Sequence, residues 1–299
     1  MTAHTVHSAT GSSRRRALLS FNSWRAWSYI LPALVFTTVF FLVPIAMMMW
    51  HSLVSRKAGK IQADPSLANY EKFFQKDYLI GSLINSLELT LATIAIGLPL
   101  AFALAAVIAF IVPKRWQIGA LILAVLPFWT SYVVRTYSWL LLLSERGLFN
   151  RLLLEAGLVS EPLTLVNDRA GVLIVFVHYF VMIMTLTIYV SLRAIPPNIF
   201  RAARDLGAST MSVFLKVVLP MSLPGVMVGV FLTFVLGIGD YVTPQIIGGS
   251  SEMMMPQAIV LQVGRFANTP QAAALSFILM SVVIAGVLVF SRWLKVSRA

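Results

Sequence analysis

The chain has 299 residues, of which 59% are hydrophobic and 11% are charged, and its mean hydropathy is +0.85. A soluble protein of this length could not shield so much apolar surface from water, so the composition favours a membrane-embedded protein. The absence of cysteine excludes disulfides, thiol nucleophiles and cysteine metal sites. The net charge of +12 is compatible with a nucleic-acid partner or with an uneven distribution of basic residues across a membrane.

Residues 1–27 are rich in serine, threonine, histidine and arginine, and we expect them to form a cytoplasmic N-terminal arm. The segment Ser13–Leu19 faintly resembles a twin-arginine export signal. No small-residue cleavage site follows it, and the next apolar stretch has the length of a full span. The arginines of the arm are therefore expected to hold the N-terminus inside.

Six nearly uncharged stretches follow, and each has about the 20 residues that a helix needs to cross the hydrocarbon core. Helices are expected because every backbone polar group must be paired inside lipid. The sequence thus predicts an all-α integral membrane protein with one membrane domain over residues 28–299. The expected spans are 28–50, 85–112, 116–143, 170–192, 220–242 and 270–291.

Lysine and arginine are unevenly divided between the connecting segments. With the N-terminus inside, the inner segments carry thirteen basic residues and one acidic residue, and the outer segments carry nine basic and eight acidic residues. Because cytoplasmic segments are enriched in lysine and arginine, we expect both termini to be cytoplasmic. The excess charge is then a topology signal, and no nucleic-acid partner is expected.

The chain shows no pattern typical of an enzyme. The pair Gly59-Lys60 lacks the remainder of a phosphate loop, no HExxH motif occurs, and no carboxylate pair has a fixed helical spacing. His178 lies in the middle of a span, where a hydrogen-bonded structural histidine is expected rather than a ligand or proton relay. We therefore expect no catalytic residue, no metal site and no cofactor bound by this chain.

The segment Arg193–Pro220, hereafter the 193–220 loop, is predicted to form two short helices. Prolines 196 and 197 end the preceding span, because proline cannot continue a helix. Asn198 is expected to cap a helix over Ile199–Leu206. Gly207 suits a left-handed cap at the end of that helix.

The second short helix is expected to start at Ser209 or Thr210, and Pro220 lies where the next membrane helix would begin. The residues Arg201-Ala202-Ala203, Gly207, Val217 and Leu219-Pro220 have the spacing of the EAA loop of binding-protein-dependent ABC importer permeases, which this loop resembles. Arg201 stands where the family pattern has glutamate, and Val217 stands where it has isoleucine.

The resemblance implies that the loop docks into a groove on a cytoplasmic ATPase subunit. An apolar face of Phe200, Ala203 and Leu206 and a pair between Arg201 and Asp205 would fit this role. The alternative is an ordinary amphipathic interfacial helix. The residues expected to couple to the ATPase are Phe200, Arg201, Ala202, Ala203, Asp205, Leu206, Gly207, Ala208, Phe214 and Pro220.

Three further segments resemble the spermidine/putrescine permease subfamily: Leu126–Trp139, Gly239–Gly249 and Asn85–Leu87. The resemblance implies the MetI-like fold of type I importer permeases in the bacterial inner membrane. It also implies two ATPase subunits that bind ATP and Mg²⁺, a second homologous permease subunit and a periplasmic solute-binding protein. The implied cargo is a polyamine or a related small organic amine, with an opine or an aminophosphonate as alternatives.

Charged residues within spans tend to face a cavity or a partner. Asp240 and Glu88 could attract an ammonium group, and aromatic side chains nearby could offer their ring faces to a cation. In the alternative reading, Arg135 snorkels or pairs with Asp240, and the aromatic residues form an interfacial belt. The candidate substrate-path residues are Asp240, Glu88, Arg135, Trp129, Tyr132, Tyr137 and Tyr241.

Four residues that can weaken a helix lie inside expected spans: Pro99, Pro127, Pro224 and Gly225. They could loosen helices that move during transport, or they could allow neighbouring helices to pack closely.

Two other classes of function remain open. A secondary transporter driven by an ion gradient would show inverted repeats and broken half-helices, and neither is evident in the sequence. If the protein were instead a membrane scaffold without transport activity, its deletion would cause no loss of solute uptake.

Overall fold

The computed structural model describes residues 23–57, 60–249 and 253–296. The chain divides into two units, residues 1–51 and 52–299, which are described separately. Most of the expected N-terminal arm, residues 1–22, lies outside the described residues, and the domain boundary expected after residue 27 stays a prediction.

The first unit is one long apolar helix. It comprises α2 (Ser23–Thr37), a π-helical turn (Thr38–Leu42) and α3 (Val43–Leu53), which crosses the unit boundary by two residues. Residues Tyr29–Leu53 are long and apolar enough to cross a membrane, as predicted. Large apolar side chains along it are exposed, as expected for a helix in contact with lipid.

The second unit begins with a hairpin that the sequence analysis did not predict. Strand β1 (Val54–Lys57) pairs antiparallel with β2 (Lys60–Pro65), and α4 (Ala68–Gln75) follows. The buried side chain of Asn69 in α4 donates to the carbonyls of Ser52 and Val54, at 3.0 and 2.7 Å. These two bonds tie α4 to the end of α3 and to the start of the first strand.

Three helices form the core of the second unit: α5 (Asp77–Ala106), α9 (Arg169–Arg193) and α12 (Leu219–Ile238). Helix α9 packs against both α5 and α12. Its buried side chains include Phe176, Phe180 and Met184. Such an apolar helix, buried on several sides, is typical of the centre of a membrane bundle.

Small residues allow the core helices to approach closely. A Cβ atom built on Gly225 of α12 would lie 2.7 Å from Cβ of Ser191 on α9, and one on Gly229 would lie 3.1 Å from Cα of Met184. Gly97 of α5 likewise faces Met184. These contacts favour a role of Gly225 in close helix packing over a role in loosening a helix that moves.

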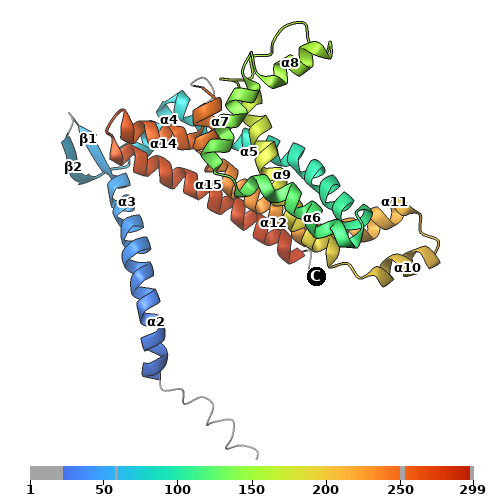
Figure 1. The fold of residues 1–299 in the computed structure, drawn as a ribbon. Coiled ribbons are helices and arrows are strands. Elements are labelled where there is room, and N and C mark those ends of the chain that lie inside the picture. Colours follow the sequence, from blue (N-terminus) through green and yellow to red (C-terminus); the bar gives the residue numbers. More distant parts are fainter. Residues whose placement is uncertain (1–22, 58–59, 250–252, 297–299) are drawn as a thin grey trace, which may run out of the picture. The chain divides into compact units, whose positions relative to one another are not determined.

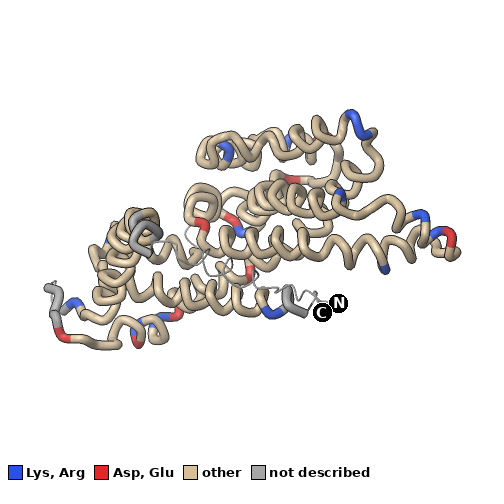
Figure 2. Tube along the Cα trace, turned by 90° about the horizontal axis from the view of Figure 1, so that it is seen from below, with Lys and Arg blue, Asp and Glu red and all other residues tan. Residues whose placement is uncertain are grey.

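The remaining helices surround this core or connect its members. They are α6 (Lys114–Val125), α7 (Tyr132–Leu143), α8 (Leu148–Glu155), α10 (Pro197–Asp205), α11 (Thr210–Val213), α13 (Val242–Ile247), α14 (Met255–Gly264) and α15 (Thr269–Val296). Within the second unit, α10 and α11 lie at one end of the core helices, and α4 and α14 lie at the other (Figure 1). Long stretches of helix carry no charged side chain (Figure 2).

Five of the predicted spans are present as helices that are long and apolar enough to cross a membrane. The third is different: α6 with the 3₁₀ turn Leu126–Trp129 and α7 with α8 are two helical segments bent by 91°. Pro127 lies at the start of the 3₁₀ turn, and Thr130 at the break has extended backbone. The Thr130 hydroxyl donates to the Pro127 carbonyl at 2.7 Å, in competition with helical bonding.

The 193–220 loop also differs from the prediction in two respects. Asn198 does not cap its first helix, because α10 begins two residues earlier than expected, with Pro196 at the cap position and Pro197 in the first turn. The second short helix is not separate. Helix α11, the π-helical turn Phe214–Val218 and α12 form one run from Thr210 to Ile238, and Pro220 lies in the first turn of α12.

Candidate functional site

The first helix of the 193–220 loop, α10, has a well-defined C-terminal end. Gly207 adopts a φ of 76°, in the left-handed region that favours glycine. Its N–H donates to the Arg204 carbonyl at 2.8 Å, and the N–H of Ala208 donates to the Ala203 carbonyl at 3.0 Å. These two bonds satisfy carbonyls that the end of α10 leaves unpaired. The predicted left-handed cap is therefore confirmed.

The start of the second helix is also as predicted. Ser209 has extended backbone, and its hydroxyl accepts a hydrogen bond from the Ser212 N–H at 3.3 Å. A serine in this position satisfies one of the free N–H groups of a helix start. The loop thus fixes the direction in which α10 leaves the bundle.

One face of α10 packs against the rest of the chain. The Phe200 ring meets the edge of Phe110 with centroids 5.8 Å apart, and Phe214 meets Phe102 at 5.7 Å. Ala203 and Ala208 are half-buried against the core. A cavity of about 370 Å³ lies beside these contacts, lined by Phe110, Phe200, Arg204, Thr210, Val213, Phe214 and Val218.

The other face of the loop is exposed, and its composition differs from the expectation. Leu206 does not share the face of Phe200 and Ala203, because α10 ends at Asp205 and Leu206 is 88% exposed in the turn. Arg201 and Asp205 are both exposed, and no ion pair joins them in the described structure. The exposed coupling candidates are thus Arg201, Ala202, Asp205, Leu206, Gly207 and Pro220, and Phe214 is partly exposed beside its contact with Phe102.

At the opposite end of α12, side chains from the bent third span, α9, α13 and the segment before α13 form a second candidate site, which we call the Tyr132 cluster. It contains Phe128, Tyr132, Arg135, Tyr179, Asp240 and Thr243. The Tyr132 hydroxyl donates to the Asp240 carboxylate and lies 2.5 Å from the Thr243 hydroxyl oxygen. The cluster therefore joins the bent third span to the segment after α12.

Asp240 is half-buried and follows the span that ends at Ile238. Its second carboxylate oxygen accepts a hydrogen bond from the Val242 N–H at 3.0 Å. Burial raises the pKa of the Asp240 carboxyl, and the hydrogen bonds that it accepts oppose this rise. Within the described residues, no cationic group lies within ion-pair distance of Asp240.

Arg135 is buried, with 8% of its surface exposed. Its guanidinium carbon lies 4.7 Å from the centre of the Tyr179 ring and 5.4 Å from that of Tyr132. Its Nη1 donates to the Pro127 carbonyl across the bend of the third span. The expected pairing of Arg135 with Asp240 is therefore wrong, whereas its snorkelling to the interface stays a prediction.

The other substrate-path candidates lie outside this cluster. Glu88 forms an ion pair with Arg169 at 2.6 Å, with the Glu88 side chain exposed and the Arg169 side chain half-buried. Trp129 and Tyr137 are 85% and 53% exposed, and Tyr241 is half-buried before α13. The structure therefore brings together Asp240, Tyr132 and Arg135, and it gives Glu88 a different partner.

The site residues predicted from the sequence did not include Phe128, Tyr179 or Thr243. The Phe128 ring stacks on Tyr179 with centroids 5.6 Å apart, and Tyr132 lies 4.9 Å from Tyr179. A tyrosine in the middle of an apolar span is a signal that could have pointed to Tyr179. Nothing in the sequence could have shown that it meets Tyr132.

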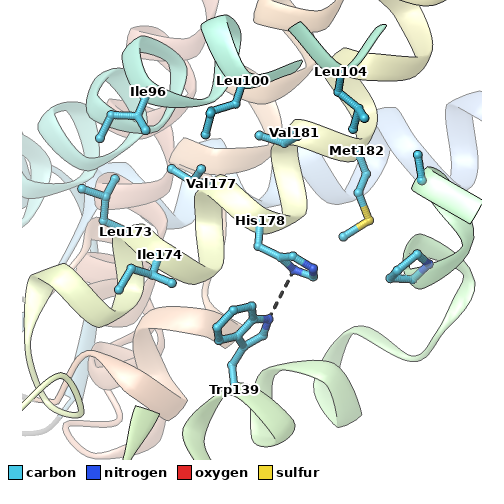
Figure 3. Close-up of a pocket in the computed structure, with 12 residues that line it drawn as sticks. Ile96, Leu100, Leu104, Trp139, Leu173, Ile174, Val177, His178, Val181 and Met182 are labelled. Atoms are coloured by element: carbon cyan, nitrogen blue, oxygen red, sulfur yellow. Dashed lines mark hydrogen bonds between the residues drawn. The ribbon is translucent and has the colours of Figure 1, made fainter. Parts of the chain in front are cut away.

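An apolar cavity of about 460 Å³ lies between α5, α6, α7 and α9. His178 and Trp139 lie next to one another in its lining (Figure 3). The Trp139 Nε1–H donates to His178 Nδ1 at 3.2 Å, which confirms the prediction of a hydrogen-bonded histidine. The other lining residues are apolar, among them Ile96, Leu100 and Val181.

The chain matches a family described as binding-protein-dependent transport system inner membrane component over residues 78–297. It is 29% identical to the spermidine/putrescine transport system permease protein PotB of Haemophilus influenzae, over 84% of this chain and 90% of that protein. It is 30% identical to the inner membrane ABC transporter permease protein YdcU of Escherichia coli K12, over 71% of each chain.

Among solved structures, the fold is similar to a chain of a bacterial alginate ABC transporter in complex with an alginate-bound periplasmic protein. The TM-score is 0.72 at 16% identity, and the match covers 90% of this chain and 93% of the other. At this identity the likeness shows the fold alone. The match over residues 78–297 spans every core helix and both candidate sites, and this chain therefore belongs to the family of inner-membrane components of binding-protein-dependent transport systems.

Proposed function

We propose that this chain is the permease subunit of an ATP-driven importer whose cargo is a polyamine or a related small organic amine. The observation that carries the cargo assignment is Asp240. Its half-buried carboxylate has no cationic partner among the described residues and lies beside the rings of the Tyr132 cluster. A carboxylate beside aromatic rings is the chemistry that attracts an ammonium group.

The relatives support the same cargo class. The PotB proteins of Haemophilus influenzae and Escherichia coli K12 are named for spermidine and putrescine transport, and the second is 27% identical over 85% of this chain. The similarity covers the span that contains Tyr132 and the segment that contains Asp240. We infer that the shared core handles related cargo.

Energy for transport would come from partner subunits. We infer two ATPase subunits that hold ATP and Mg²⁺, a second homologous permease subunit and a periplasmic solute-binding protein, with no cofactor on this chain. The exposed side of the 193–220 loop is the surface proposed to contact the ATPase. This assignment puts the loop and both termini in the cytoplasm, in agreement with the distribution of lysine and arginine.

The test is uptake by the complete complex in proteoliposomes with labelled spermidine. We expect ATP-dependent accumulation that is lost when the partner ATPase carries a mutation that abolishes hydrolysis. Collapse of the proton gradient should leave the initial rate unchanged. Uptake that depends on the proton gradient and not on the ATPase would instead support a secondary transporter. ATP-driven uptake of a solute that is not an amine, with no uptake of spermidine or another amine, would refute the cargo assignment.

A further inference from the structure

Arg135 occupies an unusual position for a buried arginine. Buried charges in proteins are usually paired with an opposite charge. In the part of the chain that the structure describes, no carboxylate lies within ion-pair distance of Arg135. Its guanidinium instead faces the rings of Tyr132 and Tyr179 and donates to the Pro127 carbonyl.

The Pro127 carbonyl does not depend on Arg135 for a partner. It also accepts hydrogen bonds from the Thr130 N–H at 3.3 Å and from the Thr130 hydroxyl at 2.7 Å. The guanidinium is therefore a third donor to an oxygen that already has two. The Pro127 carbonyl therefore does not need the positive charge of Arg135 to satisfy its hydrogen bonding.

The surrounding groups are those that bind organic cations. Two tyrosine rings present faces to the guanidinium, and Phe128 stacks behind Tyr179. The Asp240 carboxylate lies next to them, joined through the Tyr132 hydroxyl. Aromatic faces with a nearby carboxylate attract ammonium as well as guanidinium.

We propose that the Tyr132 cluster is a cation site for an ammonium group of the cargo, and that Arg135 fills this site as a tethered competitor in the state described here. When the cargo binds, its ammonium group displaces the Arg135 guanidinium from the rings of Tyr132 and Tyr179. This proposal rests on the proposed function, because it takes the cargo to be an amine. Since Pro127 and Arg135 lie on opposite sides of the 91° bend, displacement also removes a contact that spans the bend.

The first test is equilibrium binding of labelled spermidine to the complete permease–ATPase complex in nanodiscs, without nucleotide or solute-binding protein. Arg135→Gln removes the charge and retains an N–H donor for the Pro127 carbonyl. We expect it to bind spermidine about tenfold more tightly than wild type, a gain typical of a desolvated cation–π site. Tyr179→Leu in the Arg135→Gln background should reverse the gain, and Arg135→Lys, which keeps a tethered cation, should bind as weakly as wild type.

Unchanged spermidine binding in a folded Arg135→Gln complex would overturn the proposal. Succinate serves as an anionic probe. If the variant loses succinate binding and gains none for spermidine, Arg135 is an anion-binding group and the proposal is wrong.

A second measurement uses the wild-type complex and does not depend on how the variants fold. Phenylglyoxal modifies exposed guanidinium groups, and mass spectrometry reports the modification of Arg135. Saturating spermidine should increase this modification several-fold, and succinate should not. If spermidine does not increase the modification of Arg135, the cargo does not displace the guanidinium and the proposal is wrong.

The cargo assignment and the cation site can fail separately. ATP-driven uptake of a solute that is not an amine, with no uptake of spermidine or another amine, refutes the cargo assignment. Tighter spermidine binding by Arg135→Gln in that case would still support a cation site in the Tyr132 cluster.

Discussion

Two carboxylates that lie near the ends of expected spans have different surroundings. Glu88 is exposed and forms an ion pair with Arg169, so its charge is already compensated at the surface. Asp240 is half-buried and accepts hydrogen bonds from Tyr132 and Val242. Only Asp240 presents an unpaired negative charge beside aromatic rings, so we expect the two residues to differ in their effect on transport.

Replacing Asp240 with asparagine should lower spermidine uptake by roughly tenfold to a hundredfold, the range expected for loss of a charged contact. The asparagine oxygen can still accept from Val242, so the local backbone is preserved. Glu88→Gln is the matched control, and its uptake should stay within about twofold of wild type because surface ion pairs contribute little. Initial rates in proteoliposomes check both variants. Equal effects of the two substitutions would contradict the role assigned to Asp240.

At the scale of elements, the 193–220 loop combines a fixed turn with an exposed apolar tip. The left-handed Gly207 ends α10, and Ser209 starts the next helix. Phe200 and Ala203 hold α10 against the core, while Leu206 faces outward. A large exposed apolar side chain on a rigid turn is typical of an interaction site.

Gly207→Pro should leave the protein in the membrane and uncouple it from its ATPase. Proline fixes φ near −65°, whereas Gly207 has a φ of 76° and donates its N–H to Arg204. Gly207→Asn is the control, because asparagine tolerates the left-handed region. Co-purification of the ATPase and uptake report the result. A proline variant that recruits the ATPase and transports normally would remove the argument for this turn.

Leu206→Ser tests the exposed tip. The side chain is 88% exposed, so its removal should not affect folding, but it should weaken association with the ATPase about tenfold if it fills a groove there. Leu158→Ser is a matched control, because Leu158 is 71% exposed and lies in a different loop. Affinity of the ATPase for permease in nanodiscs is the measurement. A similar loss in both variants would argue against a specific role for Leu206.

At the scale of the whole molecule, the packing of α9 between α5 and α12 holds the two candidate sites in place. The 193–220 loop follows α9 and precedes α12, and Asp240 follows the other end of α12. Because α9 and α12 approach through Gly225 and Gly229, this pair of helices forms a rigid connection between the loop and the cluster.

Gly225→Ala should destabilise the second unit by about 1–3 kcal/mol, because an added Cβ overlaps Ser191 in a packed interface. Gly119→Ala is the control, since nothing lies within 4 Å of a Cβ built there. Thermal unfolding in detergent, followed by tryptophan fluorescence, should show a lower Tm only for Gly225→Ala. A Tm equal to that of the control would mean that the helices separate at little cost.

The family and the main spans could be predicted because their signals are local in the sequence. Apolar length reports a span, and lipid leaves the backbone only the helix. The turn at Gly207 was equally predictable, because its conformation depends on one residue type. Leu206 was misplaced, because the prediction extended the helix one residue past Asp205.

The sequence by itself thus determined the membrane class, five of the spans, the loop between the fourth and fifth, and the resemblance that identified the family. Only the tertiary structure decided that the third span is bent by 91° and that Asp240 meets Tyr132, 108 residues away in the chain. It also decided that Glu88 pairs with Arg169 and that Arg135 faces Tyr179. Contacts between distant segments depend on how the helices pack, and hydropathy and local spacing carry no information about which faces meet.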